Sequence, residues 1–189
     1  MLFDPCNTNK PGNRTISCSQ IKMRERSSAL TKYKINPLGT PVDTACDMET
    51  DGGGWTVIQR RTKYEAYDNN FEKDERDYER GFTTQGGALW IGYDALSYHN
   101  GAEFSIKKSM TISPDHDKCS ARLSGGWWFR ECNEANLNGR KFTYTSKIRA
   151  LGITWHIKDT YESYFYSYHN VEMKIRDDDF GFCTGPLKS

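Results

Sequence analysis

Residues 46–61 read CDMETDGGGWTVIQRR, and this stretch decides the fold. Its three consecutive glycines, residues 52–54, can adopt positive φ angles and allow an indole ring to approach the backbone closely. Apolar and β-branched side chains follow at once in residues 55–59, which is typical of a strand. We therefore expect a glycine turn that leads directly into a strand.

Two further stretches with specific sequence signals lie towards the C-terminus. The second stretch comprises residues 125–139, and the third comprises residues 153–156 together with residues 173–176. Residues 125–129 read GGWWF and are followed by Cys132, so large rings lie beside a possible covalent link. Residues 136–139 read NLNG, which predicts a turn because Asn and Gly tolerate left-handed conformations. Residues 153–156 read ITWH, and residues 173–176 read MKIR. The tryptophans of these stretches are expected in the core rather than in a ligand site: Trp55, Trp127 and Trp155.

The rest of the sequence predicts short elements joined by long loops. Residues 33–36 resemble a strand that enters a turn, and residues 88–91 form a short apolar run. The densely charged residues 71–80 predict a short surface helix. Apolar and polar side chains alternate in residues 153–157 and 171–176, as in half-buried strands. We expect an α+β fold with mostly antiparallel strands, short helices and long loops.

Composition excludes several classes of function. The chain has 189 residues, which suits one domain with its own core. Its 26 Lys and Arg nearly balance 25 Asp and Glu, which gives no charge pattern for nucleic acid or for an anionic membrane surface. No apolar run is long enough to insert into a membrane. The four histidines belong to no nucleophile, zinc or acid–base signature, so we do not expect an enzyme. The histidines are His99, His116, His156 and His169.

The cysteines point to an oxidising compartment. Their even number and wide spacing suit disulfides, although spacing alone leaves many pairings open. A glycosylation sequon at Asn13 is consistent with secretion. No signal peptide precedes the polar start of the sequence, so a secreted protein would be the mature chain or a piece of a longer one. The cysteines are Cys6, Cys18, Cys46, Cys119, Cys132 and Cys183.

Taken in order, the three stretches closely resemble the fibrinogen C-terminal-like domain of ficolins, tachylectins, angiopoietins, tenascins and fibrinogen. The resemblance covers residues 18–176, so we expect this domain between a polar N-terminal tail, residues 1–17, and a C-terminal tail, residues 177–189. The family pattern also implies two disulfides, Cys18–Cys46 and Cys119–Cys132. Cys6 and Cys183 fall outside the pattern and either pair with each other or, as we slightly favour, bridge to another molecule.

The sequence departs from the family pattern in its middle. Members of the family carry a run of strands and loops between the segment ending at Gly92 and the segment beginning at Leu96, where this protein has only residues 93–95. We therefore expect a domain that is shortened between about residues 92 and 96. Removing central strands would expose a sheet edge and apolar faces, which puts the stability of the domain in question.

The resemblance implies a calcium site in a D-x-D position. Asp115 and Asp117 stand there, and carboxylate oxygens suit calcium. Cys119 follows almost at once, which shortens the loop that would supply further oxygens. Calcium prefers six to eight oxygen ligands, so a solvated acidic pair is the alternative to a metal site.

The resemblance also implies a ligand pocket beside the Trp-Trp segment. An acetyl group needs an apolar wall for its methyl and a donor for its carbonyl. Trp128 and Phe129 could form the wall and the Asn133 amide could donate, or these side chains could simply pack the loop. Arg122 and Leu123 stand where fibrinogen has polar and acidic residues, which argues against capture of a cationic N-terminus.

The functional expectation is a secreted, lectin-like module of innate recognition that binds acetylated or other surface glycans. A shallow pocket binds weakly, so we expect homo-oligomers that add avidity. The alternatives are an extracellular protein-binding module of the angiopoietin or tenascin kind, and a shortened variant that has lost binding.

Overall fold

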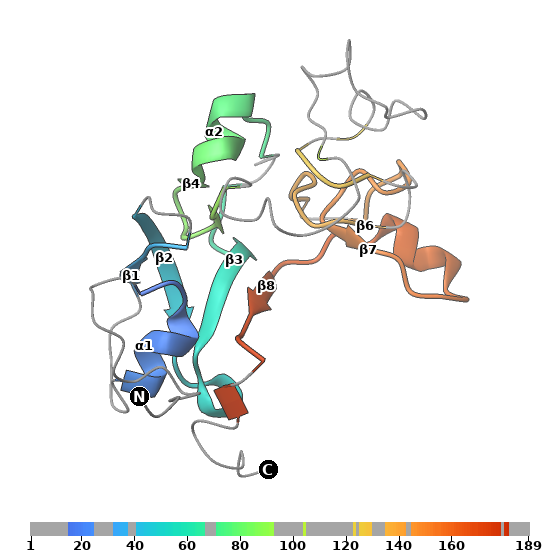
Figure 1. The fold of residues 1–189 in the computed structure, drawn as a ribbon. Coiled ribbons are helices and arrows are strands. Elements are labelled where there is room, and N and C mark those ends of the chain that lie inside the picture. The colour runs from blue at the N-terminus through green and yellow to red at the C-terminus, as the bar shows by residue number, and fades with distance from the viewer. Residues whose placement is uncertain are drawn as a thin grey trace. The chain divides into compact units, whose positions relative to one another are not determined.

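The computed structural model describes residues 15–24, 32–37, 41–66, 71–92, 104, 123, 125–129, 135–142, 145–178 and 180–181. The protein divides into two compact units (Figure 1). The first unit comprises residues 1–59 and 172–189, and the second comprises residues 60–171. Within the described residues no helix has the length and apolar character needed to cross a membrane.

Antiparallel strands form the first unit. β1 pairs with β2, and β2 pairs with β3 in a register that sets Asp47 opposite Trp55. β8 pairs with β3 as well, and the helix α1 lies beside these strands (Figure 1). The bounds are α1 Cys18–Arg24, β1 Lys32–Ile35, β2 Val42–Asp47, β3 Trp55–Arg61 and β8 Val171–Ile175. β3 continues into the second unit at Arg60.

The predicted glycine turn is present between β2 and β3. The short helix η1 (Thr50–Gly52) is followed by Gly53 with a φ of 83° and Gly54 with a φ of 80°. A Cβ atom on Gly53 would clash with the Met48 carbonyl group, and one on Gly54 would clash with the Phe180 ring. Glycine is therefore required at both positions for sterics as well as for φ.

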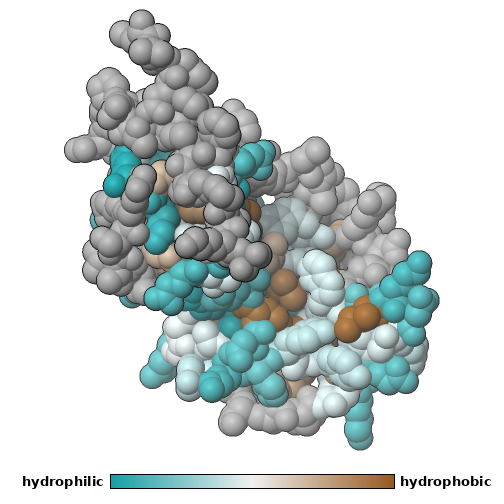
Figure 2. All heavy atoms as spheres, turned by 90° about the horizontal axis from the view of Figure 1, so that it is seen from below, coloured by the Kyte–Doolittle hydropathy of each residue, from teal (hydrophilic) through white to brown (hydrophobic). Residues whose placement is uncertain are grey.

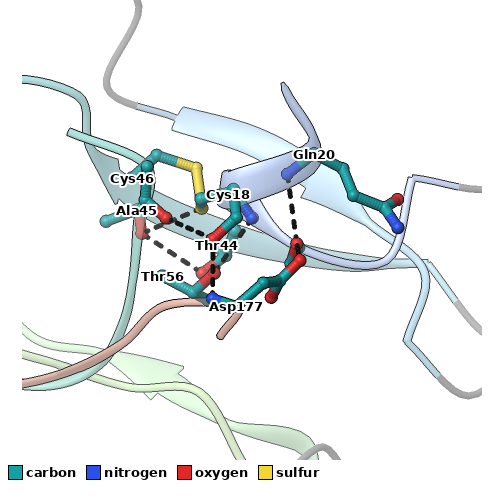
Figure 3. The surroundings of a disulfide bond; sticks show 10 residues. Cys18, Gln20, Thr44, Ala45, Cys46, Thr56 and Asp177 are labelled. Carbon is teal, nitrogen blue, oxygen red and sulfur yellow. Dashed lines mark hydrogen bonds between the residues drawn. A yellow bond between two sulfur atoms is a disulfide. The ribbon is translucent and has the colours of Figure 1, made fainter. Parts of the chain in front are cut away.

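A disulfide fixes α1 to the sheet, as the resemblance predicts. Cys18 and Cys46 are bonded, with their Cα atoms 5.7 Å apart (Figure 3). The backbone amide of Cys18 also donates to Thr56 Oγ1 at 3.0 Å. At the other end of the sequence, Asp177 accepts from the Ser17 hydroxyl at 2.7 Å. These contacts tie the N-terminal helix to β2, to β3 and to the segment that follows β8.

The polypeptide remains packed beyond Arg176. The Phe180 side chain is buried, and the Arg176 guanidinium lies 4.2 Å from the Trp55 ring centre and 4.9 Å from that of Phe180. Arg176 also donates to the Asp51 carbonyl at 2.8 Å. The domain limits expected from the sequence stay predictions, but the burial of Phe180 is a feature that the sequence did not reveal.

Short elements joined by loops form the second unit. β4 pairs antiparallel with β5, and β6 pairs antiparallel with β7. The predicted helix in residues 71–80 occupies only the last part of that range, because the Asp74 side chain accepts from the Asp77 amide at 2.9 Å and so caps the helix start. The bounds are α2 Glu75–Arg80, β4 Phe82–Thr83, β5 Leu89–Trp90, β6 Ala135–Asn136, β7 Thr154–Trp155 and η3 Tyr161–Phe165.

The expectation that Trp155 lies in the core is wrong. Its side chain is 53% exposed, while the neighbouring Thr154 is fully buried. The Thr154 hydroxyl contacts two carbonyl oxygens, those of Gly152 at 3.0 Å and Tyr166 at 3.1 Å, so a polar residue takes the inward position. Trp155 is consequently on the outward side of β7, and the predicted longer strand is reduced to two residues.

The alternation of buried and exposed side chains expected for residues 171–176 also fails, at the end of β8. Ile175 is 41% exposed, although it shares a face with the half-buried Met173 in the predicted pattern.

On the face drawn in Figure 2, hydrophilic residues cover much of the described surface, and hydrophobic residues gather in a few groups.

Candidate ligand-binding site

The Gly125–Gly126 backbone positions the Trp-Trp segment in the second unit. Gly125 has a φ of 80°, and a Cβ atom there would clash with the Asn138 carbonyl oxygen. The Gly126 amide donates to the Tyr78 hydroxyl at 2.7 Å, and the Asn138 side-chain amide donates to the Gly126 carbonyl at 2.9 Å. The segment is thus held from one side by α2 and from the other by the predicted turn at residues 136–139.

Tyr78 is the central residue of this support. Its side chain is fully buried, and its hydroxyl donates to the Phe71 carbonyl at 2.6 Å while it accepts from Gly126. Burial raises the pKa of the Tyr78 phenol well above its usual value. The phenol therefore stays protonated and can keep both hydrogen bonds at neutral pH.

Seven rings form what we call the aromatic cluster. The half-buried Trp128 ring lies 5.5 Å from the Trp90 ring, 5.2 Å from the Phe104 ring and 5.5 Å from the Trp127 ring, measured between ring centres. The Trp90 indole donates to the Tyr78 carbonyl at 3.0 Å, which fixes the cluster to α2. Its members are Phe71, Tyr78, Phe82, Trp90, Phe104, Trp127 and Trp128.

Phe129 packs on a different group from Trp128. It is half-buried against Leu123, which is 1% exposed and is also contacted by Leu151. The two residues predicted as the apolar wall therefore both reach the surface, but each rests on its own layer of side chains. Trp128 is backed by aromatic rings, and Phe129 is backed by Leu123.

Several predicted site residues lie outside the described residues. They are Asn133 of the pocket, Asp115 and Asp117 of the calcium site, Cys119 and Cys132, and the sequon residue Asn13. Their roles stay predictions. Where the structure does describe the protein, no group of three or more His, Cys, Asp or Glu side chains could hold a metal ion.

A buried ion pair that no sequence pattern indicated supports the turn at residues 136–139. The Arg61 side chain donates to both carboxylate oxygens of Glu65, at 3.2 and 3.0 Å, and neither side chain is exposed. Arg61 also donates to the Leu137 carbonyl at 3.3 Å and to the Gly139 carbonyl at 2.6 Å. Burial lowers the pKa of Arg61, and the charge of Glu65 opposes that shift.

Arg61 and Glu65 were detectable only as two charges four residues apart at the end of a predicted strand. Charges in such a place normally face solvent. The guanidinium instead lies 4.0 Å from the Phe71 ring centre, so the ion pair joins the aromatic cluster to the turn. Because an unpaired buried charge is costly, both partners are needed for this connection.

The family model for the C-terminal globular domain of the fibrinogen beta and gamma chains matches residues 15–97 and 93–178. The two matched segments meet at the place where the sequence predicts a shortened domain; the shortening itself stays a prediction. In solved structures, the fibrinogen-like globe domain of human ANGPTL2 is similar with a TM-score of 0.66 and 23% identity, over 86% of this protein and 98% of that one. The lamprey fibrin D-dimer, solved with the peptide ligand Gly-His-Arg-Pro-amide, has a TM-score of 0.61 and 19% identity, over 92% of this protein and 77% of that one.

Curated relatives carry two kinds of name. A techylectin-like protein of Phoneutria nigriventer is 29% identical over 201 residues, which cover 86% of this sequence and 82% of that protein. Techylectin-5A of Tachypleus tridentatus is 31% identical over 211 residues, covering 78% of this sequence and 69% of that protein. Angiopoietin-related protein 7 of Homo sapiens is 31% identical over 207 residues, covering 78% of this sequence and 58% of that protein. The expected fold class is confirmed by the structural neighbours.

Proposed function

Because this protein belongs to the family of C-terminal globular domains found in the fibrinogen beta and gamma chains, we propose that it is a secreted recognition module, rather than an enzyme, and that it binds acetylated or other surface glycans. Two of its relatives are named as techylectins, and a lectin binds sugars. The widely spaced cysteines and the Cys18–Cys46 disulfide favour an extracellular location.

The observation that carries the glycan proposal is the support beneath Trp128 and Phe129. Both side chains are half-exposed, and the backbone before them is fixed by hydrogen bonds to Tyr78 and Asn138. A weak ligand benefits from such pre-organisation, because little conformational entropy is lost when it binds. In the proposed site Trp128 and Phe129 contact the acetyl methyl, and Asn133 donates to the acetyl carbonyl.

Glycan-array binding in the presence of free N-acetylglucosamine tests this proposal. We expect binding to N-acetylated glycans, and we expect millimolar free sugar to abolish that binding. Asn133→Ala should lower the affinity about fivefold, since a hydrogen bond in a small site contributes about 1 kcal/mol. Asn9→Ala, outside the stretch that resembles the family, is the control. A folded sample that binds no acetylated glycan would disprove the proposal.

A protein-binding module is the second candidate. Angiopoietin-related protein 7 and techylectin-5A are equally identical to this protein, at 31%. This alternative predicts that binding to extracellular proteins persists in saturating N-acetylglucosamine. Oligomers linked through Cys6 or Cys183 would raise the avidity of either kind of module, and non-reducing gel electrophoresis would detect them.

A further inference from the structure

Arg149, in the second unit, has a charge without a counter-ion among the described residues. Its guanidinium carbon lies 3.6 Å from the Tyr164 ring centre and 5.8 Å from that of Tyr161. Within the described part of the protein no carboxylate or carbonyl pairs with it, and its buried Nε has no hydrogen-bond partner. Buried N–H groups are nearly always paired, so this exception calls for an explanation.

The Arg149 guanidinium and the His156 ring both lie against the Tyr164 ring. The His156 ring lies 3.9 Å from the Tyr164 ring centre at an angle of 7°, so the two rings are parallel. Two groups so close to one ring centre can only occupy its opposite faces. Tyr164 is itself 9% exposed and is therefore sandwiched between Arg149 and His156. A guanidinium whose carbon lies over a ring can keep terminal N–H donors beyond the ring edge, where an oxygen atom can reach them.

The loop that carries Arg149 has a strained backbone. Ala150 has a φ of 58°, which an alanine rarely adopts. The strain is maintained by two backbone hydrogen bonds to η3, from Ala150 to the Tyr164 carbonyl at 2.8 Å and from Ser146 to the Phe165 carbonyl at 3.2 Å. Strain of this kind persists where surrounding structure imposes it, and it clusters at ligand sites.

Charge and exposed apolar surface indicate the chemistry of a ligand. Residues 145–158 contain Lys147, Arg149 and Lys158 but no Asp or Glu, so the loop that carries Arg149 is basic, and Asp159 and Glu162 follow it in the sequence. Tyr161 packs edge-on against Tyr164 and Phe165 and is 62% exposed. A sugar ring has an apolar C–H face that can cover such an exposed aromatic ring, while a charged substituent reaches the neighbouring arginine.

We infer that Arg149, Tyr161 and Tyr164 form a binding site for a saccharide that carries a carboxylate or a sulfate. The Arg149 edge donates a pair of hydrogen bonds to the anionic group, and Tyr161 packs against the sugar ring. Tyr164 orients the guanidinium. This site shares no residue with the one proposed at Trp128, Phe129 and Asn133, so either can fail without the other.

Binding to three oligosaccharides, measured by isothermal titration calorimetry on the 189-residue protein, tests the inference. The probes are an oligogalacturonate, a sulfated galactan oligosaccharide and the unsulfated galactan. We expect binding of one or both anionic probes, weak or no binding of the neutral one, and an affinity at least tenfold lower in Arg149→Gln. Arg149→Lys keeps the charge but loses the paired donors, so it should recover only part of the affinity.

Two further variants separate this site from general effects. Tyr161→Ala should weaken binding several-fold without disturbing the Arg149–Tyr164 stack, and Lys32→Gln, which removes the same charge from the exposed edge of β1, should change affinity less than twofold. Free N-acetylglucosamine should not compete with the anionic probes. Arg149→Gln should not alter the glycan-array binding that free N-acetylglucosamine abolishes, because that binding belongs to the other proposed site. Three results would overturn the inference. They are an equal loss of affinity in Lys32→Gln and Arg149→Gln, no binding of either anionic probe, and binding of a poly-glutamate peptide as strong as that of the anionic saccharides.

Discussion

At the scale of single residues, the candidate site depends on buried polar groups that support exposed rings. Tyr78 links the Phe71 carbonyl to the Gly126 amide, and Arg61 links Glu65 to the turn that carries Asn138. Neither contact is visible in the sequence, because tyrosines and arginines usually lie with their polar ends in water. The residues that the sequence does identify, Trp128 and Phe129, are the half-exposed layer above this support.

Tyr78→Phe tests the importance of the buried hydroxyl. The substitution keeps the ring in the aromatic cluster but leaves the Gly126 amide and the Phe71 carbonyl without this partner. Leaving buried groups unsatisfied costs about 1–3 kcal/mol each, so we expect the free energy of unfolding to fall by about 2–3 kcal/mol. Urea denaturation followed by tryptophan fluorescence measures this change. Tyr64→Phe is the control because Tyr64 is 73% exposed; equal effects of the two changes would contradict the prediction.

Asp47 makes the first unit sensitive to acid. Burial raises the pKa of its carboxyl, but hydrogen bonds from Lys174 at 2.7 Å and from the amides of Glu49 and Thr50 at 3.0 Å outweigh that effect and hold the pKa well below its usual value. A carboxyl with a lowered pKa in the folded state stabilises the fold above its unfolded pKa, which is about 3.9. That contribution is lost as the pH falls through the folded value.

Asp47→Asn should therefore lower the free energy of unfolding at pH 7 by about 1.5–3 kcal/mol, the range for a hydrogen bond to a charged group. The difference from the unmodified protein should shrink as the pH falls below about 4, because protonation also neutralises the natural carboxyl. Urea denaturation at several pH values measures it. Asp43→Asn, at an exposed ion pair with Lys34, should have little effect. A pH-independent difference for Asp47→Asn would refute the electrostatic explanation.

At the scale of elements, the sequence predicts strands where glycine turns or β-branched residues mark them and fails where tertiary contacts decide. The turn before β3 and the strand itself are found where they are expected. β7 is shorter than expected because the Thr154 hydroxyl finds two carbonyl partners inside, which no alternation pattern can anticipate. The helix α1 is likewise not predicted, since contacts distant in sequence fix it against the strands, among them its disulfide, its bond to Thr56 and the Ser19 hydroxyl bond to the Gly54 carbonyl.

Replacing both Cys18 and Cys46 by alanine tests the fixation of α1. The disulfide closes a loop with a sequence separation of 28. On a chain-entropy model this contributes about 3 kcal/mol to the free energy of unfolding. We expect a loss of that size in urea denaturation, together with faster hydrogen exchange in residues 18–24 than in the strands β2 and β3. If the exchange of α1 stays as slow as that of β2, the helix is held by its hydrogen bonds alone.

At the scale of the whole molecule, the family was predictable and the binding chemistry was not. Ordered motifs of glycine, tryptophan and cysteine mark the fold because they meet backbone and packing demands, as at Gly53 and Gly54. Ligand specificity depends on a few side chains in loops, which differ between proteins that share one fold. Relatives named as techylectins and as an angiopoietin-related protein are equally similar to this protein, which illustrates that separation.

Calcium binding at Asp115 and Asp117 is a prediction for the 189-residue protein. If the two carboxylates bind the ion in the folded state only, calcium at 100 times its dissociation constant stabilises the fold by about 2.7 kcal/mol. The melting temperature should therefore be higher in calcium than in a chelator, and Asp115→Asn with Asp117→Asn should abolish the difference. Asp178→Asn, an exposed carboxylate elsewhere, should leave it unchanged. A melting temperature that is equal in calcium and in chelator would contradict calcium binding. It would favour the alternative of a solvated acidic pair, because two carboxylates alone supply too few oxygens for the ion.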